Sequence, residues 1–172
     1  QPMVVVLGSQ GTTSTERFLF GSHTIHAIKH LQWSVISVPK GRSFTAIKKI
    51  GMASTLENIT GRMPVTEIKE FVESFKASFH VINIGKEDNF NPDIPFGAET
   101  LKEMMAPVVP EYHFIGSEDT DNAIMNFADE EKLDLLIILP KHHSFIDNLV
   151  HTSHTKNFVL HAHVPLLALH KK

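Results

Sequence analysis

Glycine is concentrated in one short stretch near the start of the chain. The segment GSQGTTSTERFLFGSHT, residues 8–24, holds three of the 9 glycines in 172 residues and follows the apolar run VVVL. Gly8 ends the expected strand, Gly11 follows three residues later, and Gly21 with Ser22 opens the next amphipathic segment. Glycine tolerates positive φ and lets a ligand approach the backbone closely. Consecutive amides beside a helix N-terminus attract anions, so this spacing predicts a phosphate-binding loop with Ser22 as the helix cap.

Two other phosphate loops do not fit this stretch. No Gly-Lys-Ser or Gly-Lys-Thr follows Gly8 at P-loop spacing, and no Gly-x-Gly-x-x-Gly occurs in the chain. A second interpretation stays open, in which these glycines only turn the chain after a strand. The glycine at the helix start favours the ligand interpretation, because a turn alone does not require it.

The elements that position this loop follow from the hydrophobic pattern. Short apolar runs alternate with amphipathic segments, which is typical of parallel strands buried on both faces and joined by crossover helices. The pattern predicts strands at Met3–Leu7, Val35–Val38, Ile47–Ala53, Phe79–Ile84, Tyr112–Ile115, Leu135–Leu139 and Pro165–Leu169. It predicts helices from Ser22 towards Leu31, from Pro64, around Ala98–Met105, and over Thr120–Lys132 with Thr120 as the cap. The expected fold class is α/β, with an open parallel five-stranded sheet and helices on both faces.

An internal repeat divides the chain into two units. SHTIHAIKHLQWSVISV from Ser22 aligns without gaps on SHTKNFVLHAHVPLLAL from Ser153, and each copy follows a strand and a loop. Residues 1–40 are therefore interpreted as the C-terminal part of a first domain, and residues 41–172 as a whole second domain. The front part of the first domain would be about 100 residues. We expect the two units to pair as a pseudo-dimer through their final strands.

The glycine pattern resembles a known family. Glycine, two residues, glycine, nine residues, glycine and serine, at Gly8, Gly11, Gly21 and Ser22, is similar to the nucleotide-binding loop of universal stress proteins. The order of elements in residues 41–172 looks like one entire domain of that family. The resemblance implies a Rossmann-like fold of the adenine nucleotide alpha hydrolase type, in tandem, and a nucleotide-binding regulatory role in the stress response. It implies that ATP, with Mg²⁺ as a companion ion, is held by Gly8, Ser9, Gln10, Gly11, Gly21, Ser22 and His23. The family's acidic residue on the adenine side would precede Gln1.

The second unit departs from that pattern. Pro140 and His143 stand in the places of Gly8 and Gly11, and Thr152 replaces Gly21. Proline removes an amide donor, and side chains obstruct a close approach by phosphate. The first strand of this unit ends in Met52-Ala53-Ser54-Thr55, which contains no aspartate where members that bind ATP would be expected to carry one near Thr55. We therefore predict that the second unit is structural.

Histidines and catalysis raise further alternatives. Of the 12 histidines, His142, His143, His151 and His154 fall within 13 residues, which suits either a zinc or nickel site or a solvated segment. No HExxH motif and no cysteine accompanies them, so no metal ligand is assigned. No Gly-x-Ser-x-Gly nucleophile elbow occurs, and we predict that the protein is not an enzyme. Slow ATP hydrolysis, aided by Mg²⁺ and Glu16 or Arg17, stays open.

Charge and composition limit the partners. A formal charge of −3 and a pI near 6.5 argue against nucleic acid and anionic membranes. No apolar run approaches the roughly 20 residues of a membrane helix, and the absence of cysteine fits the cytoplasm. The predicted function is thus a cytoplasmic, adenine-nucleotide-binding stress protein that forms a homodimer. The alternative is a scaffold or dimerisation protein whose glycine loop is vestigial.

Overall fold

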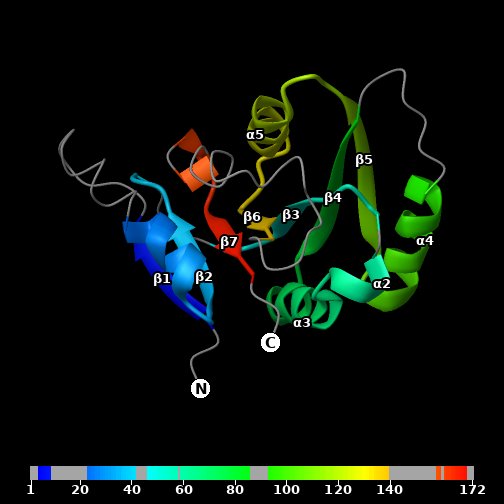
Figure 1. The fold of residues 1–172 in the computed structure, drawn as a ribbon, viewed down its shortest axis with the longest axis horizontal. Helices are drawn as coiled ribbons and strands as arrows, with labels where there is room; N and C mark the ends of the chain where they lie inside the picture. The colour runs from blue at the N-terminus through cyan, green and yellow to red at the C-terminus, as the bar shows by residue number, and fades with distance from the viewer. Residues whose placement is uncertain are drawn as a thin grey trace.

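The chain forms one mostly parallel sheet with helices on both faces (Figure 1). A computed structural model describes residues 4–8, 23–41, 46–57, 59–85, 93–139, 158–159 and 161–169. The strands are β1 (Val4–Gly8), β2 (Ser34–Val38), β3 (Lys49–Ala53), β4 (Ser78–Gly85), β5 (Pro110–Gly116), β6 (Leu135–Ile138) and β7 (Leu166–Ala168). The helices are α2 (Ile59–Arg62), α3 (Val65–Phe75), α4 (Asp93–Met105) and α5 (Thr120–Glu130), and residues 23–30 are also helical. The expected α/β class is confirmed.

The sheet has seven strands rather than the expected five. Its order is β1-β2-β7-β6-β3-β4-β5, in which the five strands from β7 to β5 are mutually parallel. The strands β1 and β2 are parallel to each other, and β2 joins β7 in the antiparallel sense, with Val35 opposite Ala168 and Ser37 opposite Leu166. An open edge leaves backbone donors and acceptors unpaired, and this pairing satisfies both edges at once. The final strands of the two predicted units therefore lie edge to edge.

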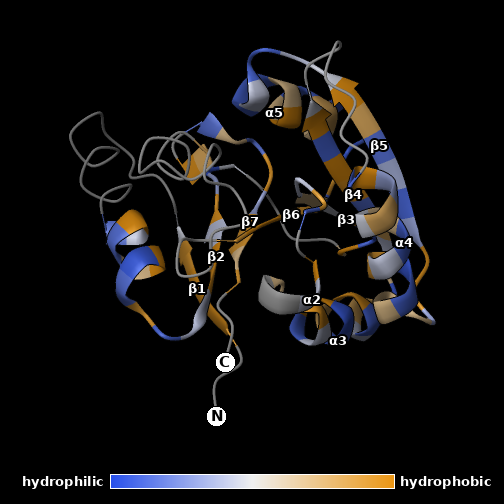
Figure 2. Ribbon diagram, turned by 45° about the vertical axis from the view of Figure 1, so that its right-hand side comes forward, coloured by the Kyte–Doolittle hydropathy of each residue, from blue (hydrophilic) through white to orange (hydrophobic). Residues whose placement is uncertain are grey.

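Two hydrophobic layers cover the sheet, one on each face. Alternate residues of β4 enter different layers: Phe79 and Val81 pack with α2, α3 and α4, whereas Ile82 packs with α5 and the helix at 23–30. In Figure 1 the helices α2 and α3 lie on one side of the central strands and α5 lies on the other. Figure 2 shows the matching alternation of polar and apolar bands along β4 and β5.

Two helix starts differ from the expected ones. The helix α4 begins at Asp93, five residues before the expected Ala98, and so contains Pro95 and Gly97. Proline is tolerated in the first turn of a helix because the amides there have no intrahelical partner. The cap of α5 is Asp119 rather than Thr120, since the Asp119 carboxylate accepts a hydrogen bond from the amide of Asn122 at 3.1 Å.

Within the described ranges, none of the helices combines the length and the apolar character needed to cross a membrane.

Candidate functional site

Gly8 and Thr24 meet at the carboxyl end of β1. Gly8 is the last residue of β1 and is exposed, and a Cβ placed on it would meet no atom of the described residues within 4 Å. The hydroxyl of Thr24 donates a hydrogen bond to the Gly8 carbonyl oxygen at 3.1 Å, and Thr24 is buried. This bond fastens the start of the helix at 23–30 to the end of the strand. The helix therefore brings the unpaired amides of its first turn to this position.

Two of the seven predicted nucleotide contacts can be placed at this end of β1. Gly8 is one, and His23, exposed and adjacent to Thr24 in the chain, is the other. Ser9, Gln10, Gly11, Gly21 and Ser22 lie outside the described residues, as do Glu16 and Arg17. The assignment of these residues to a nucleotide stays a prediction.

The sheet order locates the corresponding crevice of the second unit. From β5 the order runs back to β3 and then continues with β6 and β7, so it reverses between β3 and β6. Open α/β sheets bind ligands at such a reversal, outside the carboxyl ends of the strands. The crevice at this reversal is flanked by the loops that follow β3 and β6, and the loop after β3 is the one that the structure describes. The strand β1 is parallel to β2, and β2 is antiparallel to β7. The carboxyl end of β1 therefore points in the opposite direction from the carboxyl ends of β3 and β6.

The loop after β3 is closed by its own contacts. The amide of Leu56 donates to the Ser54 hydroxyl at 3.0 Å, and the Asn83 side chain donates to the Ser54 carbonyl oxygen at 3.0 Å. Leu56 is fully buried in the layer of α2 and α4 and has a positive φ of 61°. An apolar side chain thus fills the core directly after Thr55, beside the position where an aspartate was sought. Pro140, His143 and Thr152 lie outside the described residues.

A polar cluster that the sequence interpretation missed lies where β4 and β5 begin. It consists of His80, Glu111 and His113, which offer ligand atoms within 4.8 Å of one another. The spacing of Glu111 and His113, two residues apart in a strand, places both on one face and was a readable signal. Their meeting with His80 depends on the register, which pairs His80 with Glu111. The histidine-rich stretch from His142 to His154 lies outside the described residues.

Several solved structures with a similar arrangement are described as universal stress proteins. One from Archaeoglobus fulgidus DSM 4304 superimposes with a TM-score of 0.68 at 13% identity, over 98% of this chain and 61% of that chain. A universal stress protein in complex with cAMP gives 0.56 at 14% identity, and one from Archaeoglobus fulgidus in complex with dAMP gives 0.52 at 12%. Each of these two is matched over its full length by 74% of this chain. The chain thus spans about 61% of the length of the first of these relatives, and the low identities establish the fold.

Sequence comparison adds the family. Among curated proteins, no sequence matches this chain. Residues 86–170 match the Universal stress protein family, a range that begins directly after β4 and runs through β7. The matched range, together with the strand order and the helices on both faces, agrees with the resemblance that the glycine spacing raised. The chain belongs to the universal stress protein family.

Proposed function

We propose that this chain is a nucleotide-binding regulatory module of the stress response. The ligand is an adenine nucleotide, held by the loop that begins at Gly8 and returns to the helix at 23–30. Residues 1–40 act as the C-terminal part of one domain, and residues 41–172 act as a second, structural domain. The proposal goes beyond family membership and rests on the geometry around Gly8.

The bond between Thr24 and Gly8 carries the proposal. It ties a helix start to a strand end at 3.1 Å, which is the arrangement that concentrates free amides at one point. The open space around the α-carbon of Gly8 leaves room for a ligand. A helix N-terminus also carries a partial positive charge, which favours phosphate.

The adenine class is supported by two similar structures. Universal stress proteins have been solved with cAMP and with dAMP, and both share the fold of this chain. Within that class we propose ATP, with Mg²⁺ as the companion ion, because a loop of several amides suits a polyphosphate. The contacts would come from Gly8, Ser9, Gln10, Gly11, Gly21, Ser22 and His23.

The second unit is proposed to be structural for two reasons. The end of β3 is closed by the bonds among Ser54, Leu56 and Asn83, and the segment Met52–Thr55 holds no aspartate. The final strand β7 is used for pairing with β2. This unit therefore supports the edge of the first one, and the whole is proposed to form a homodimer in the cytoplasm.

Bound nucleotide is the decisive measurement. The protein is purified from cells and denatured, and any released nucleotide is identified by chromatography and mass spectrometry. We expect an adenine nucleotide from the parent and none from Gly11→Val or Gly21→Val. Binding of added ATP with Mg²⁺ is then measured by calorimetry. A parent that releases no nucleotide and binds no added ATP would refute the proposal.

The variant Gly8→Val tests the described part of the loop. A Cβ at this position meets no atom of the described residues within 4 Å, so we expect the described fold to stay intact. Intrusion on a bound phosphate should cost about 1–3 kcal/mol, or about 5- to 150-fold in affinity. Gly85→Val is the matched control, because Gly85 ends β4 with equally open surroundings. Equal ATP affinity in the parent and both variants would remove Gly8 from the site.

A scaffold role is the second candidate. Large apolar side chains are exposed on α4 and β5 and between them, namely Phe96 at 76%, Val109 at 72% and Phe114 at 60%. Such side chains favour association with another protein when they lie together. In that case the glycine loop has only a structural role, and mutation of Gly8 leaves the association with the partner protein unchanged.

No dedicated catalytic reaction is proposed. If slow ATP hydrolysis occurs, it requires Mg²⁺ and a group such as Glu16 or Arg17 near the phosphates. Release of inorganic phosphate from ATP with Mg²⁺, compared between the parent and Glu16→Gln, measures this activity.

A further inference from the structure

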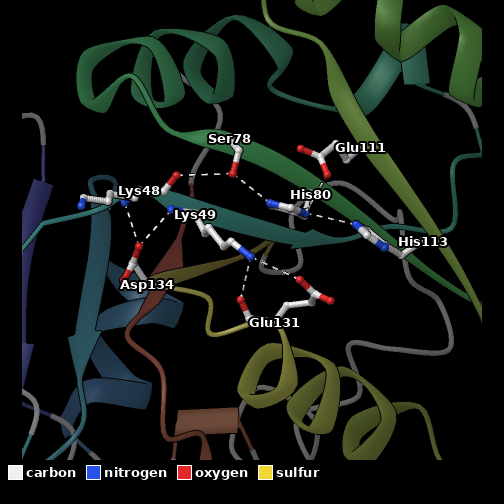
Figure 3. Close-up of polar contacts among 8 residues, drawn as sticks. All are labelled: Lys48, Lys49, Ser78, His80, Glu111, His113, Glu131 and Asp134. Atoms are coloured by element: carbon white, nitrogen blue, oxygen red, sulfur yellow. Dashed lines mark hydrogen bonds and ion pairs between the residues drawn. The ribbon is translucent and has the colours of Figure 1, made fainter.

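Three side chains from two neighbouring strands converge on the α5 side of the sheet. His80 lies on β4, and Glu111 and His113 lie on β5 (Figure 3). Nδ1 of His80 is 3.1 Å from Nε2 of His113 and 3.7 Å from a carboxylate oxygen of Glu111. In the parallel register Glu111 is opposite His80 and His113 is opposite Ile82, so all three side chains project to one face.

A hydrogen-bond chain orients the His80 ring. The Ser78 hydroxyl donates its one proton to the Lys48 carbonyl oxygen at 3.4 Å. Its oxygen lies 2.9 Å from Nε2 of His80; the donor and acceptor in this contact depend on the ring tautomer, and a proton on Nε2 is the tautomer that fits the donation to Lys48. This tautomer leaves a lone pair on Nδ1, directed towards Glu111 and His113. Histidines that bind metal ions are held in this way, with the second ring nitrogen donating to another group.

The His80 ring is also held in place by burial. Its side chain is 4% exposed, whereas the Glu111 side chain beside it is 59% exposed. The cluster thus has one fixed ligand and one that can be reached from the solvent.

Neighbouring charges leave this position suitable for a cation. The nearest lysine is Lys49 on β3, whose ammonium is held by the Glu131 carboxylate at 3.3 Å and by the Glu131 carbonyl oxygen at 3.1 Å. The backbone amides of Lys48 and Lys49 both donate to Asp134, so that carboxylate is already used (Figure 3). Glu111 is 59% exposed, which leaves its carboxylate free to close on an ion from the solvent side.

Two of the distances between ligand atoms are close to those around a small tetrahedral ion, and all three atoms lie within 4.8 Å of one another. Zinc binds histidine nitrogen and carboxylate oxygen at about 2.0–2.2 Å, which separates neighbouring ligand atoms by about 3.3 Å. The two nitrogens, at 3.1 Å, already have this spacing, and the 3.7 Å between Nδ1 and the carboxylate is closed by a small rotation of Glu111. Two histidines and one carboxylate leave a fourth position for water, as in open zinc sites.

This cluster is separate from the proposed nucleotide loop. The strands β1 and β4 are five positions apart in the sheet, or about 24 Å at 4.7–4.9 Å per strand. The cluster also lies at the beginnings of β4 and β5, away from the crevice at the ends of β3 and β6. A ligand here would act independently of the one at Gly8.

We propose that His80, Glu111 and His113 form a binding site for a divalent transition-metal ion of the zinc type. Nδ1 of His80, Nε2 of His113 and one oxygen of Glu111 are the ligands, and Ser78 is a positioning residue that fixes the tautomer of His80. The bound ion links β4 to β5. The Phe127 ring of α5, 4.6 Å from the His113 ring, covers one side of the site.

The test is metal titration of the full-length protein. The chain is stripped with EDTA and titrated with Co²⁺ by visible absorption and with Zn²⁺ by calorimetry. Loss of a ligand in His113→Ala or Glu111→Gln is expected to weaken one binding event by at least about 100-fold, because loss of an outer-shell partner alone costs about 10- to 100-fold. Ser78→Ala should fall in that smaller range. His163→Ala is the matched control, since His163 faces Asp129 at 3.3 Å but belongs to no described three-residue cluster.

The outcomes separate this site from other histidines. Weakening in the three cluster variants, with the His163→Ala variant within about twofold of the parent, supports the proposal. The proposal is overturned if the parent and the cluster variants bind the metal ion with the same affinity. It is also overturned if His163→Ala weakens binding as much as the cluster variants do, or if the parent binds no metal ion. Should the histidine variant lose its fold, Glu111→Gln decides, because that side chain is exposed. Nitrogen NMR adds a direct readout: Zn²⁺ should shift Nδ1 of His80 and Nε2 of His113, and unchanged shifts refute the assignment.

Discussion

Gly97→Ala should destabilise the protein although it improves helix propensity. In a solvent-facing helix this change gains about 1 kcal/mol. Gly97, however, is buried in α4 against the loop after β3, and a Cβ there would lie 1.7 Å from the Leu56 carbonyl oxygen and 2.8 Å from its carbonyl carbon. A relaxed carbon-to-oxygen contact needs about 3.3 Å, so helix and loop must separate by about 1.6 Å.

The loop has little freedom to move that far. Leu56 is fully buried at a φ of 61°, and the Ser54 bonds to Leu56 and Asn83 hold the same turn at 3.0 Å each. Overpacking of this kind costs about 1–3 kcal/mol and occasionally more. A separation of 1.7 Å places the cost at the upper end of this range, and after subtraction of the gain in propensity we expect a net loss of about 2 kcal/mol. For a chain of this size, that lowers Tm by about 4–8 °C.

Urea unfolding followed by circular dichroism measures the effect. The midpoint should fall while the slope m stays unchanged, which shows that stability rather than compactness changed. Gly85→Ala is the control, since a Cβ there meets no atom of the described residues within 4 Å, and its effect should stay within about 0.5 kcal/mol. A Gly97→Ala variant as stable as the parent, or more stable, would refute the contact between α4 and the loop.

Two further predictions concern α5 and the single tyrosine. Asp119→Ala should lower the free energy of unfolding in urea by about 1 kcal/mol, because it removes the capping carboxylate that accepts from the Asn122 amide. Thr120→Ala should lower it by less. A larger loss in Thr120→Ala than in Asp119→Ala would identify Thr120 as the cap. Burial raises the pKa of Tyr112 to about 12, and its hydroxyl donates to the Ala98 carbonyl oxygen at 2.6 Å. Because this pKa lies above the unfolded value of about 10, the stabilisation is complete below pH 10 and is lost as pH rises through 12. Absorbance at 295 nm reports this one tyrosine, and a native midpoint near 10 would contradict the packing of Tyr112.

The strands were predictable because burial on both faces leaves a continuous apolar run. Leu135–Ile138 is buried at every position and was recognised from composition alone. The start of α4 was not, because Pro95 and Gly97 are residues that usually end helices. Gly97 is required there by the approach of Leu56, and residues so far apart in the sequence carry no local signal of that contact.

The two candidate sites differ in how far local sequence reveals them. The predicted glycine loop is a local motif, since Gly8, Gly11, Gly21 and Ser22 all lie within residues 8–24. The metal-type cluster joins His80 to His113 across 33 residues. Only the register of β4 against β5 sets the distance between their nitrogens, and register depends on packing across the whole sheet.

The sequence by itself determined the α/β class and the run of strands and helices, and it predicts the internal repeat and the glycine loop. These follow from periodicity and from backbone freedom, which are local properties of the chain. The tertiary structure decided that β2 and β7 join two sets of strands into one seven-stranded sheet, that Leu56 closes the end of β3, and that His80, Glu111 and His113 meet. Each of these depends on which strand edges and faces come together, which is settled by burial and hydrogen bonding over the whole molecule rather than by neighbouring residues.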